Sequence, residues 1–157
     1  GTGVATRAMA RALPAGASIV ATDLNQPMLD RAAAIGTARP VEWRQADAMQ
    51  LPFADASFDA VVAANVLHLV PDVSGALAAM RRVLRPGGRV VVPTYLHDET
   101  AVSWIVSRAL ALTGFPGRRR FTSRGLRDAV ESAGLRIDRF ETIPGPIPIG
   151  YVDGQFE

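Results

Sequence analysis

The feature that most constrains the fold of this sequence is a regular alternation between short β-branched runs and segments of helical spacing. Runs rich in valine, isoleucine and alanine alternate with segments in which apolar residues recur every three or four positions. Strands are expected at 18–24, 40–46, 58–67 and 89–96, and helices at 4–13, 25–36 and 71–84. This order predicts an α/β fold with a doubly wound, mostly parallel sheet.

The last third of the chain departs from this alternation. Two helices are expected at 99–113 and 122–134, followed by two strands at 135–143 and 149–156. The segment 144–146, Pro-Gly-Pro, is a strong turn signal between these strands. We therefore expect an antiparallel strand at the C-terminal edge of the sheet.

The amino-acid composition limits the classes of protein to which this chain can belong. A chain of 157 residues with 48% hydrophobic residues is expected to form one domain, 1–157, with a real core. No apolar run approaches the roughly 18 residues of a membrane span, and no secretory leader is evident. We expect a cytoplasmic protein without a membrane span.

Charge and reactive residue types exclude several functions. The net charge is only +2 and every basic residue is arginine, which favours a compositional bias over a nucleic-acid surface. The absence of lysine excludes a P-loop lysine, a Schiff base and the Tyr/Lys pair of many nicotinamide reductases. With no cysteine and two histidines, His68 and His97, we expect no metal site.

A glycine turn and two acids indicate a nucleoside site. Gly1-Thr2-Gly3 precedes the first helix, and Asp23 ends the following strand 20 residues after Gly3. A carboxylate there can accept hydrogen bonds from both ribose hydroxyls, although a turn or capping aspartate is the alternative. Asp47 ends the next strand, where it can accept from an adenine amine.

The chain resembles class I S-adenosylmethionine-dependent methyltransferases of the small-molecule type, related to the ubiquinone/menaquinone-biosynthesis enzymes. Gly1-Thr2-Gly3 is similar to the end of the family's Asp-x-Gly-x-Gly-x-Gly motif. Further matching segments lie at 21–24, 28–29, 45–53, 58–62, 65–68 and 82–89. The resemblance is strong over residues 1 to about 96, and it implies a Rossmann-like fold with S-adenosylmethionine as the cofactor.

The resemblance also implies roles for particular residues. Gly1, Thr2 and Gly3 would lie against the cofactor, and Asp23 would hold the ribose. The adenine would be held by Asp47 and the Ala48 N–H, with Leu24 and Met49 as apolar walls. Asn65 would bind the methionine portion through its backbone or side chain.

Methyl transfer requires little more than in-line placement of the acceptor and exclusion of water. If the acceptor must lose a proton, His68 is the candidate base, with packing or substrate binding as the alternative. His97 and Asp98 follow a strand at the same sheet edge and are candidates to line the acceptor pocket, although Asp98 can equally be a helix cap. Tyr95 and Trp104 either face substrate or pack in the core.

The run 118–120, three arginines, is interpreted as a solvated loop, with a phosphate-bearing or anionic acceptor as the alternative. The sequence specifies neither the methyl acceptor nor the oligomeric state.

One departure from the family is the strand that should precede Gly1. The family's sheet order is 3-2-1-4-5-7-6, so this first strand is central, and we expect the sequence to be an N-terminally truncated piece that lacks it. A degenerate protein that acts as a binding or scaffolding subunit is the alternative. A nicotinamide-dependent oxidoreductase is the rival enzyme, but the third small residue of the dinucleotide fingerprint is missing at Thr6.

Overall fold

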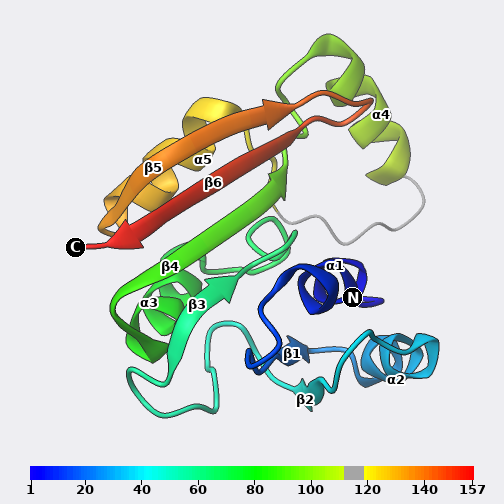
Figure 1. Cartoon of the computed structure of the whole chain (residues 1–157). Coiled ribbons are helices and arrows are strands. Elements are labelled where there is room, and N and C mark those ends of the chain that lie inside the picture. The colour runs from blue at the N-terminus through cyan, green and yellow to red at the C-terminus, as the bar shows by residue number, and fades with distance from the viewer. Residues whose placement is uncertain (112–118) are drawn as a thin grey trace. The chain divides into compact units, whose positions relative to one another are not determined.

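The computed structural model describes residues 1–111 and 119–157 (Figure 1). The chain divides into two compact units, Gly1–Pro52 and Phe53–Glu157, which we call the N-terminal and C-terminal units. The N-terminal unit contains α1 (Val4–Ala12), β1 (Val20–Asp23), α2 (Gln26–Ile35) and β2 (Glu42–Gln45). The C-terminal unit contains β3 (Phe58–Val62), α3 (Val73–Val83), β4 (Leu84–Tyr95), α4 (Ala101–Ala111), α5 (Ser123–Ser132), β5 (Leu135–Ile143) and β6 (Ile149–Phe156).

In the N-terminal unit, β1 and β2 form a parallel pair with Val20 opposite Glu42 and Asp23 opposite Gln45. Helix α2 connects them, and its limits follow from local chemistry. The Asn25 side chain accepts a hydrogen bond from the Met28 N–H at 3.1 Å, which caps the first turn. Gly36 ends the helix with φ of 80°. The helix predicted at 25–36 is confirmed.

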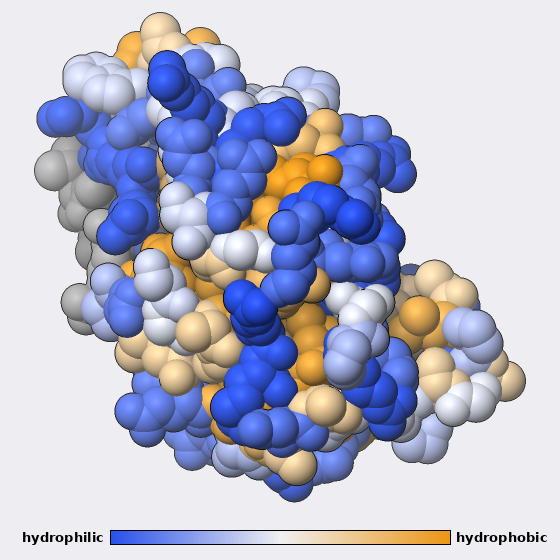
Figure 2. All heavy atoms as spheres, turned by 90° about the vertical axis from the view of Figure 1, so that its left-hand side faces the viewer, coloured by the Kyte–Doolittle hydropathy of each residue, from blue (hydrophilic) through white to orange (hydrophobic). Residues whose placement is uncertain are grey.

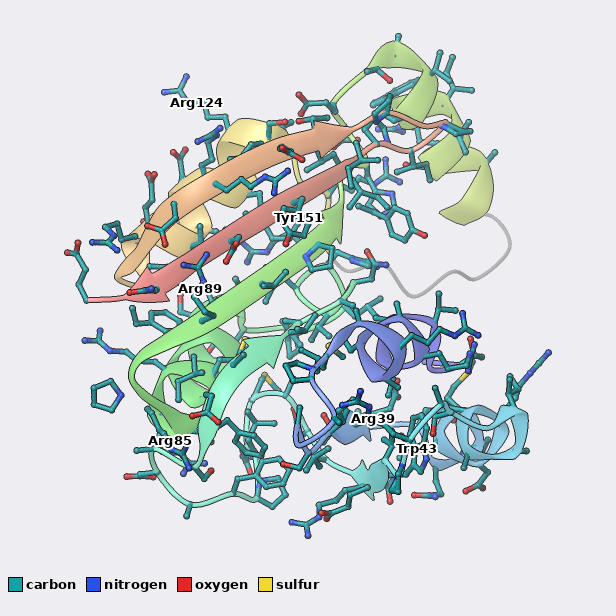
Figure 3. All side chains as sticks on the ribbon, viewed as in Figure 1. Arg39, Trp43, Arg85, Arg89, Arg124 and Tyr151 are labelled. Atoms are coloured by element: carbon teal, nitrogen blue, oxygen red, sulfur yellow. The ribbon has the colours of Figure 1, made fainter. Side chains whose placement is uncertain are left out.

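Helix α1 is held at its C-terminal end by Arg39, which lies between α2 and β2 (Figure 3). The guanidinium of Arg39 donates to the carbonyl oxygens of Ala10, Leu13 and Pro14. The last carbonyls of a helix have no partners within the helix, so an arginine at this place satisfies them and complements the helix dipole.

In the C-terminal unit, four strands pair in the order β3-β4-β6-β5. Figure 1 shows β4, β6 and β5 side by side, with α3 and α5 behind them. The side chains of Val90, Val92 and Thr94 on β4 are fully buried, as is Val152 on β6. Alternate residues of these strands therefore form the core, and α3 and α5 contribute apolar residues such as Leu77 and Leu126.

The other face of this sheet carries charged residues. Arg89 pairs with Asp138 at 3.0 Å and with Asp153 at 2.6 Å, and Arg139 pairs with Glu141 at 2.6 Å. Figure 3 labels Arg89 and Tyr151 on the strands toward the viewer. Figure 2 shows the adjacent side of the molecule, where hydrophilic residues dominate and apolar side chains are visible between them.

The observed strands β1 and β2 are shorter than predicted by one to two residues at each end, and two other strand boundaries differ by five residues. β3 ends at Val62, whereas the apolar run predicted a strand to residue 67, because Asn65 has a left-handed backbone conformation that a strand does not contain. β4 begins at Leu84 and includes the Pro86-Gly87-Gly88 turn signal, since the pairing with β3 continues across an irregularity.

The sheet topology agrees with the family's order. The pair β2-β1 matches strands 3 and 2, and β3-β4-β6-β5 matches strands 4, 5, 7 and 6. The antiparallel strand is β6, and it lies one strand inside the edge, which β5 forms. Among the described residues no strand pairs with both β1 and β3. The truncation and the single domain over 1–157 stay predictions.

Within residues 1–111 and 119–157, no helix combines the length and the apolar character that crossing a bilayer requires.

Candidate functional site

The N-terminal unit brings Gly1 and Asp23 into contact. Asp23 is the last residue of β1, and its Oδ2 lies against the backbone nitrogen of Gly1. Its other oxygen, Oδ1, accepts from the Asn25 N–H at 2.8 Å. The carboxylate thus faces the glycine turn, which is the adjacency that the sequence predicted. It also contributes to the turn into α2, as the alternative interpretation predicted, and its role toward a ribose stays a prediction.

Gly3 lies in a position that no other residue fits well. Its φ is 76°, and an added Cβ would lie 3.1 Å from atoms of Ala32, Arg7 and Trp43. Both the left-handed backbone and the close packing therefore require glycine. Thr2, between the two glycines, accepts a hydrogen bond at its carbonyl from Arg7 Nη1 at 2.8 Å.

Asp47 follows β2 by two residues, and its Oδ1 accepts from the Met49 N–H at 2.9 Å. The Gln50 N–H donates to the Asp47 carbonyl at 3.0 Å, which closes a turn. Because β1 and β2 are parallel neighbours, Asp23 and Asp47 follow strands that end at the same sheet edge.

The apolar residues expected around an adenine ring lie beside these acids. Leu24 is 66% exposed, although it directly follows a strand, whereas Ala48 and Met49 are half-buried. A large apolar side chain exposed beside a carboxylate is a surface that an aromatic ring can cover.

In the C-terminal unit, Asn65 has features of a ligand-binding residue. Its φ is 56°, and its N–H donates to the Pro93 carbonyl at 2.8 Å, which holds the backbone in this conformation. The Asn65 Oδ1 is buried and has no hydrogen-bond partner within the described part of the chain. A strained backbone and an unsatisfied buried oxygen both carry an energetic cost that a bound donor would offset.

Three aromatic rings pack together after strands β3 and β4. His68 is 1% exposed, and its ring centroid lies 5.8 Å from that of Tyr95 and 5.5 Å from that of His97. Tyr95 and His97 are 6.0 Å apart. The structure thus brings His68 and His97 together at the carboxyl ends of two neighbouring strands.

Burial lowers the pKa of both histidines. The pKa of His68 falls to about 4, first because burial disfavours the imidazolium and then because His97 is a like charge when protonated. The pKa of His97 is lowered by burial and by the Arg120 guanidinium, with a smaller opposing effect of Asp98. Both rings are therefore neutral at pH 7.

The remaining predicted residues are placed as follows. Asp98 pairs with Arg120 at 3.7 Å and does not cap α4, because Thr100 and Ser103 cap it reciprocally at 3.0 and 2.9 Å. Trp104 is 45% exposed, so core packing is wrong for this residue. Arg119 and Arg120 are exposed, as the solvated loop predicts, and Arg118 lies outside the described residues.

Ser107 was not singled out by its sequence pattern. Its Oγ lies 2.8 Å from His97 Nδ1, and with Ser103 it forms a buried polar pair on α4. Two serines four positions apart on an apolar helix were the available signal. No group of three possible metal-ligating side chains is found in the part of the chain that the structure describes.

Comparisons with known proteins agree with this arrangement. A family model described as "Methyltransferase domain" matches residues 1–92. The ubiquinone/menaquinone biosynthesis C-methyltransferase UbiE of Teredinibacter turnerae is 43% identical over 106 residues, which cover 65% of this chain and 43% of that protein. The UbiE of Saccharophagus degradans is 37% identical over 106 residues, with the same coverage. The chain thus spans less than half the length of these relatives.

Solved structures show the same fold at lower sequence identity. A putative methyltransferase from Bacillus halodurans has a TM-score of 0.75 and 24% identity, over 91% of this chain and 62% of that one. The methyltransferase in a complex with the Trm112 activator from Haloferax volcanii has a TM-score of 0.81 and 19% identity, over 99% of this chain and 78% of that one. With a family model that covers more than half of its residues, this chain belongs to the class I S-adenosylmethionine-dependent methyltransferase family.

Proposed function

We propose that the protein transfers a methyl group from S-adenosylmethionine to a small-molecule acceptor. The observation that carries the proposal is the pair of carboxylates, Asp23 and Asp47, that follow neighbouring parallel strands beside the glycine turn. Acids at the ends of two such strands are suited to a ribose and an adenine. The cofactor supplies an electrophilic sulfonium methyl, so the protein's task is to bind, align and exclude water.

The residues of the N-terminal unit are suited to the nucleoside. Asp23 is proposed to accept from ribose hydroxyls, which is consistent with the contact of its carboxylate with Gly1 in the glycine turn. Asp47 and the Ala48 N–H are proposed to pair with the adenine edge. Leu24 and Met49 are proposed to cover the faces of the ring, which is consistent with the exposure of Leu24.

Asn65 is proposed to bind the methionine portion. Its buried Oδ1 can accept from an ammonium group, and this oxygen has no partner within the described part of the chain. This is the feature of the C-terminal unit that fits the cofactor, because a bound donor would satisfy the atom.

The proposed class of methyl acceptor is based on the names of the similar proteins. The UbiE proteins are named as C-methyltransferases of ubiquinone and menaquinone biosynthesis. We propose that a quinol-type ring is methylated on carbon, and that nucleic acid is not an acceptor. The cytoplasmic location stays a prediction.

The proposal is tested by calorimetric titration of the full-length protein with S-adenosylmethionine and S-adenosylhomocysteine. Binding in the micromolar range is expected for the wild type. Asp23→Asn should weaken binding by about tenfold or more, because a hydrogen bond to a charged group contributes about 1.5–3 kcal/mol. Asp30→Asn is the matched control, since Asp30 is an exposed acid of α2 that bonds only to Gln26 among the bonds described.

Two results would contradict the proposal. Absence of binding by the folded wild type would favour a degenerate scaffolding protein. Oxidation of NAD(P)H with a carbonyl substrate, followed by absorbance, would favour the nicotinamide oxidoreductase.

A further inference from the structure

Helix α4 has its polar and apolar side chains in the opposite arrangement to an ordinary surface helix. Ser103 and Ser107 are buried, whereas Val102 and Ile105 are both 60% exposed and Trp104 is 45% exposed. A helix at the surface of a domain normally places its apolar stripe against the core. Figure 1 shows α4 at the upper right, at the margin of the C-terminal unit. The apolar side chains of this helix are therefore on its outer side.

Hydrogen bonds hold the serine side of α4 against the protein. The Ser107 Oγ lies 2.8 Å from His97 Nδ1 and donates to the His97 carbonyl oxygen at 3.3 Å. Ser103 bonds to Thr100 within the first turn, so its hydroxyl is satisfied although it is buried. Because the two serines are four positions apart, they lie on one side of the helix. Turning the apolar side inward would break the contact of Ser107 with His97.

The exposed apolar residues adjoin one another along the helix. Val102 and Ile105 are three positions apart, and the two exposed alanines lie one turn before and one turn after Ile105. We define the outward face of α4 as Ala101, Val102, Trp104, Ile105, Arg108 and Ala109. Single exposed apolar residues are common, but an adjoining group of them marks a binding surface.

The charge of the outward face is positive. Arg108 is the one ionisable residue in the sequence of Ala101–Ala111, and it is exposed. Its guanidinium carbon lies 4.4 Å from the centroid of the Trp104 ring, a cation–π contact that keeps both side chains on this face. The indole N–H and the guanidinium can donate hydrogen bonds but cannot accept them. A complementary surface therefore offers negative charge and hydrogen-bond acceptors.

The acids that precede α4 are bonded to other groups. Asp98 pairs with Arg120 at 3.7 Å, and Glu99 accepts hydrogen bonds from the N–H and the hydroxyl of Ser123 at 2.6 and 2.9 Å. Arg119 is exposed and lies near the start of α4, since its neighbour Arg120 pairs with Asp98. The nearby acids therefore do not reverse the positive charge of the outward face.

We propose that the outward face of α4 binds the surface of a lipid bilayer that carries anionic phosphate headgroups. The apolar side chains enter the boundary between headgroups and acyl chains, where tryptophan is favoured because its ring is apolar and its N–H is polar. Phosphate oxygens accept from Arg108 and supply the complementary charge. A typical protein interface makes about ten direct hydrogen bonds, whereas this face has few groups that can make them.

The proposal is tested by flotation of the full-length protein with vesicles of phosphatidylcholine and phosphatidylglycerol in equal amounts. Vesicles of phosphatidylcholine alone measure binding without the anionic headgroup. We expect binding to the mixed vesicles to be at least about tenfold stronger and to weaken as salt is raised, because salt screens exposed charges. A folded wild type that binds neither vesicle, or both equally, would overturn the proposal.

Matched variants locate the contact. Ile105→Ser should weaken vesicle binding by about tenfold, since it removes a large aliphatic side chain from the outward face. Ile35→Ser is its control, because Ile35 is 54% exposed on α2. Arg108→Gln should weaken binding about fivefold, and Arg124→Gln, which removes the same charge from an exposed position of α5, should not. Thermal unfolding checks that each variant is folded. Equal losses in the variants and their controls would place the contact outside α4.

Trp104 reports entry into the bilayer. Lipids with bromine on the acyl chains quench the fluorescence of a tryptophan that lies close to them. We expect quenching in the wild type and loss of most of it in Trp104→Phe, in which Trp43 remains as the emitting residue. Undiminished quenching in this variant would contradict the proposal, because another part of the chain would then be in contact with lipid.

Sedimentation equilibrium distinguishes a second copy of the chain as the occupant of the outward face. We expect the wild type and Ile105→Ser to have the same mass in solution. A dimer that forms without lipid and is lost in Ile105→Ser would assign the face to self-association and overturn the lipid proposal. S-adenosylmethionine binding in solution should be equal in both proteins, so a failure of the lipid proposal leaves the proposed function standing.

Discussion

The Nε of Arg39 donates to the carbonyl oxygen of Ala10 at 2.8 Å, across 29 residues of sequence. The same guanidinium reaches Leu13 and Pro14, so one side chain satisfies three carbonyls at the end of α1. α1 begins directly after Gly3, whose turn is proposed to bind the cofactor, and Arg39 therefore stabilises the helix that follows the candidate site.

Arg39→Ala should lower the free energy of unfolding by about 2 kcal/mol, since it leaves the partly buried carbonyl of Ala10 and the two exposed carbonyls that follow α1 without a charged donor. Arg39→Lys should lower the free energy of unfolding by a smaller amount, because an ammonium keeps the charge but lacks the planar fork of the guanidinium. Urea unfolding of the full-length protein measures both. Arg31→Ala, at an exposed position of α2, is the control, and an equal loss in this variant would rule out the capping role.

Gly3→Ala should destabilise the protein and should also weaken S-adenosylhomocysteine binding. Gly3 has φ of 76° and ψ of 21°, and an alanine in this left-handed conformation is strained by about 1–2 kcal/mol. An added Cβ would in addition lie 3.1 Å from atoms of Ala32, Arg7 and Trp43. Gly16→Ala is the control, because an added Cβ there meets nothing within 4 Å. Thermal unfolding and calorimetric titration measure both variants, and equal effects would show that neither the strain nor the close contacts at Gly3 matter.

Asn65→Gly should weaken S-adenosylhomocysteine binding by about tenfold while leaving stability almost unchanged. Glycine adopts the observed φ of 56° without strain, but it lacks the amide oxygen proposed to bind the ligand. Asn65→Ala should lose the same affinity and in addition about 1 kcal/mol of stability, because alanine is strained at positive φ. Wild-type affinity of the glycine variant would exclude the side chain from the cofactor site.

The buried His68 should make the protein less stable in mild acid. Its pKa is about 4 in the folded state and 6.5 when unperturbed, so the unfolded state binds more protons between these values. The free energy of unfolding should be constant above about pH 6.5 with respect to this group and fall by about 3 kcal/mol toward pH 4. His68→Gln should flatten this part of the stability curve measured by urea titration at each pH. An unchanged slope in the variant would assign the loss to other groups.

Local signals predicted the helix ends well. The Asn25 cap, Pro27 in the first turn and Gly36 at the end specify α2, and the Thr122 side chain caps α5. The Pro-Gly-Pro turn at 144–146 correctly predicted the hairpin of β5 and β6. These features depend on residues within a few positions of one another, so the sequence carries them directly.

Signals that depend on distant contacts were less informative. On α1 the apolar Val4 is 71% exposed, whereas the polar Thr6 is buried. On α4 the exposed residues include the apolar Val102 and Ile105. Helical periodicity identifies a helix, but the elements that pack against it decide which face is covered.

The candidate site also combines features that the sequence carries directly with features that depend on distant contacts. The sequence by itself determined the α/β alternation and the positions of Gly3, Asp23 and Asp47, because motif spacing follows the chain. Only the tertiary structure decided that His97 meets Ser107 ten residues later on α4, and that His68 is a buried neighbour with a lowered pKa. A hydrogen bond and a desolvation cost depend on distance and burial in space, and the spacing of residues along the chain does not specify either.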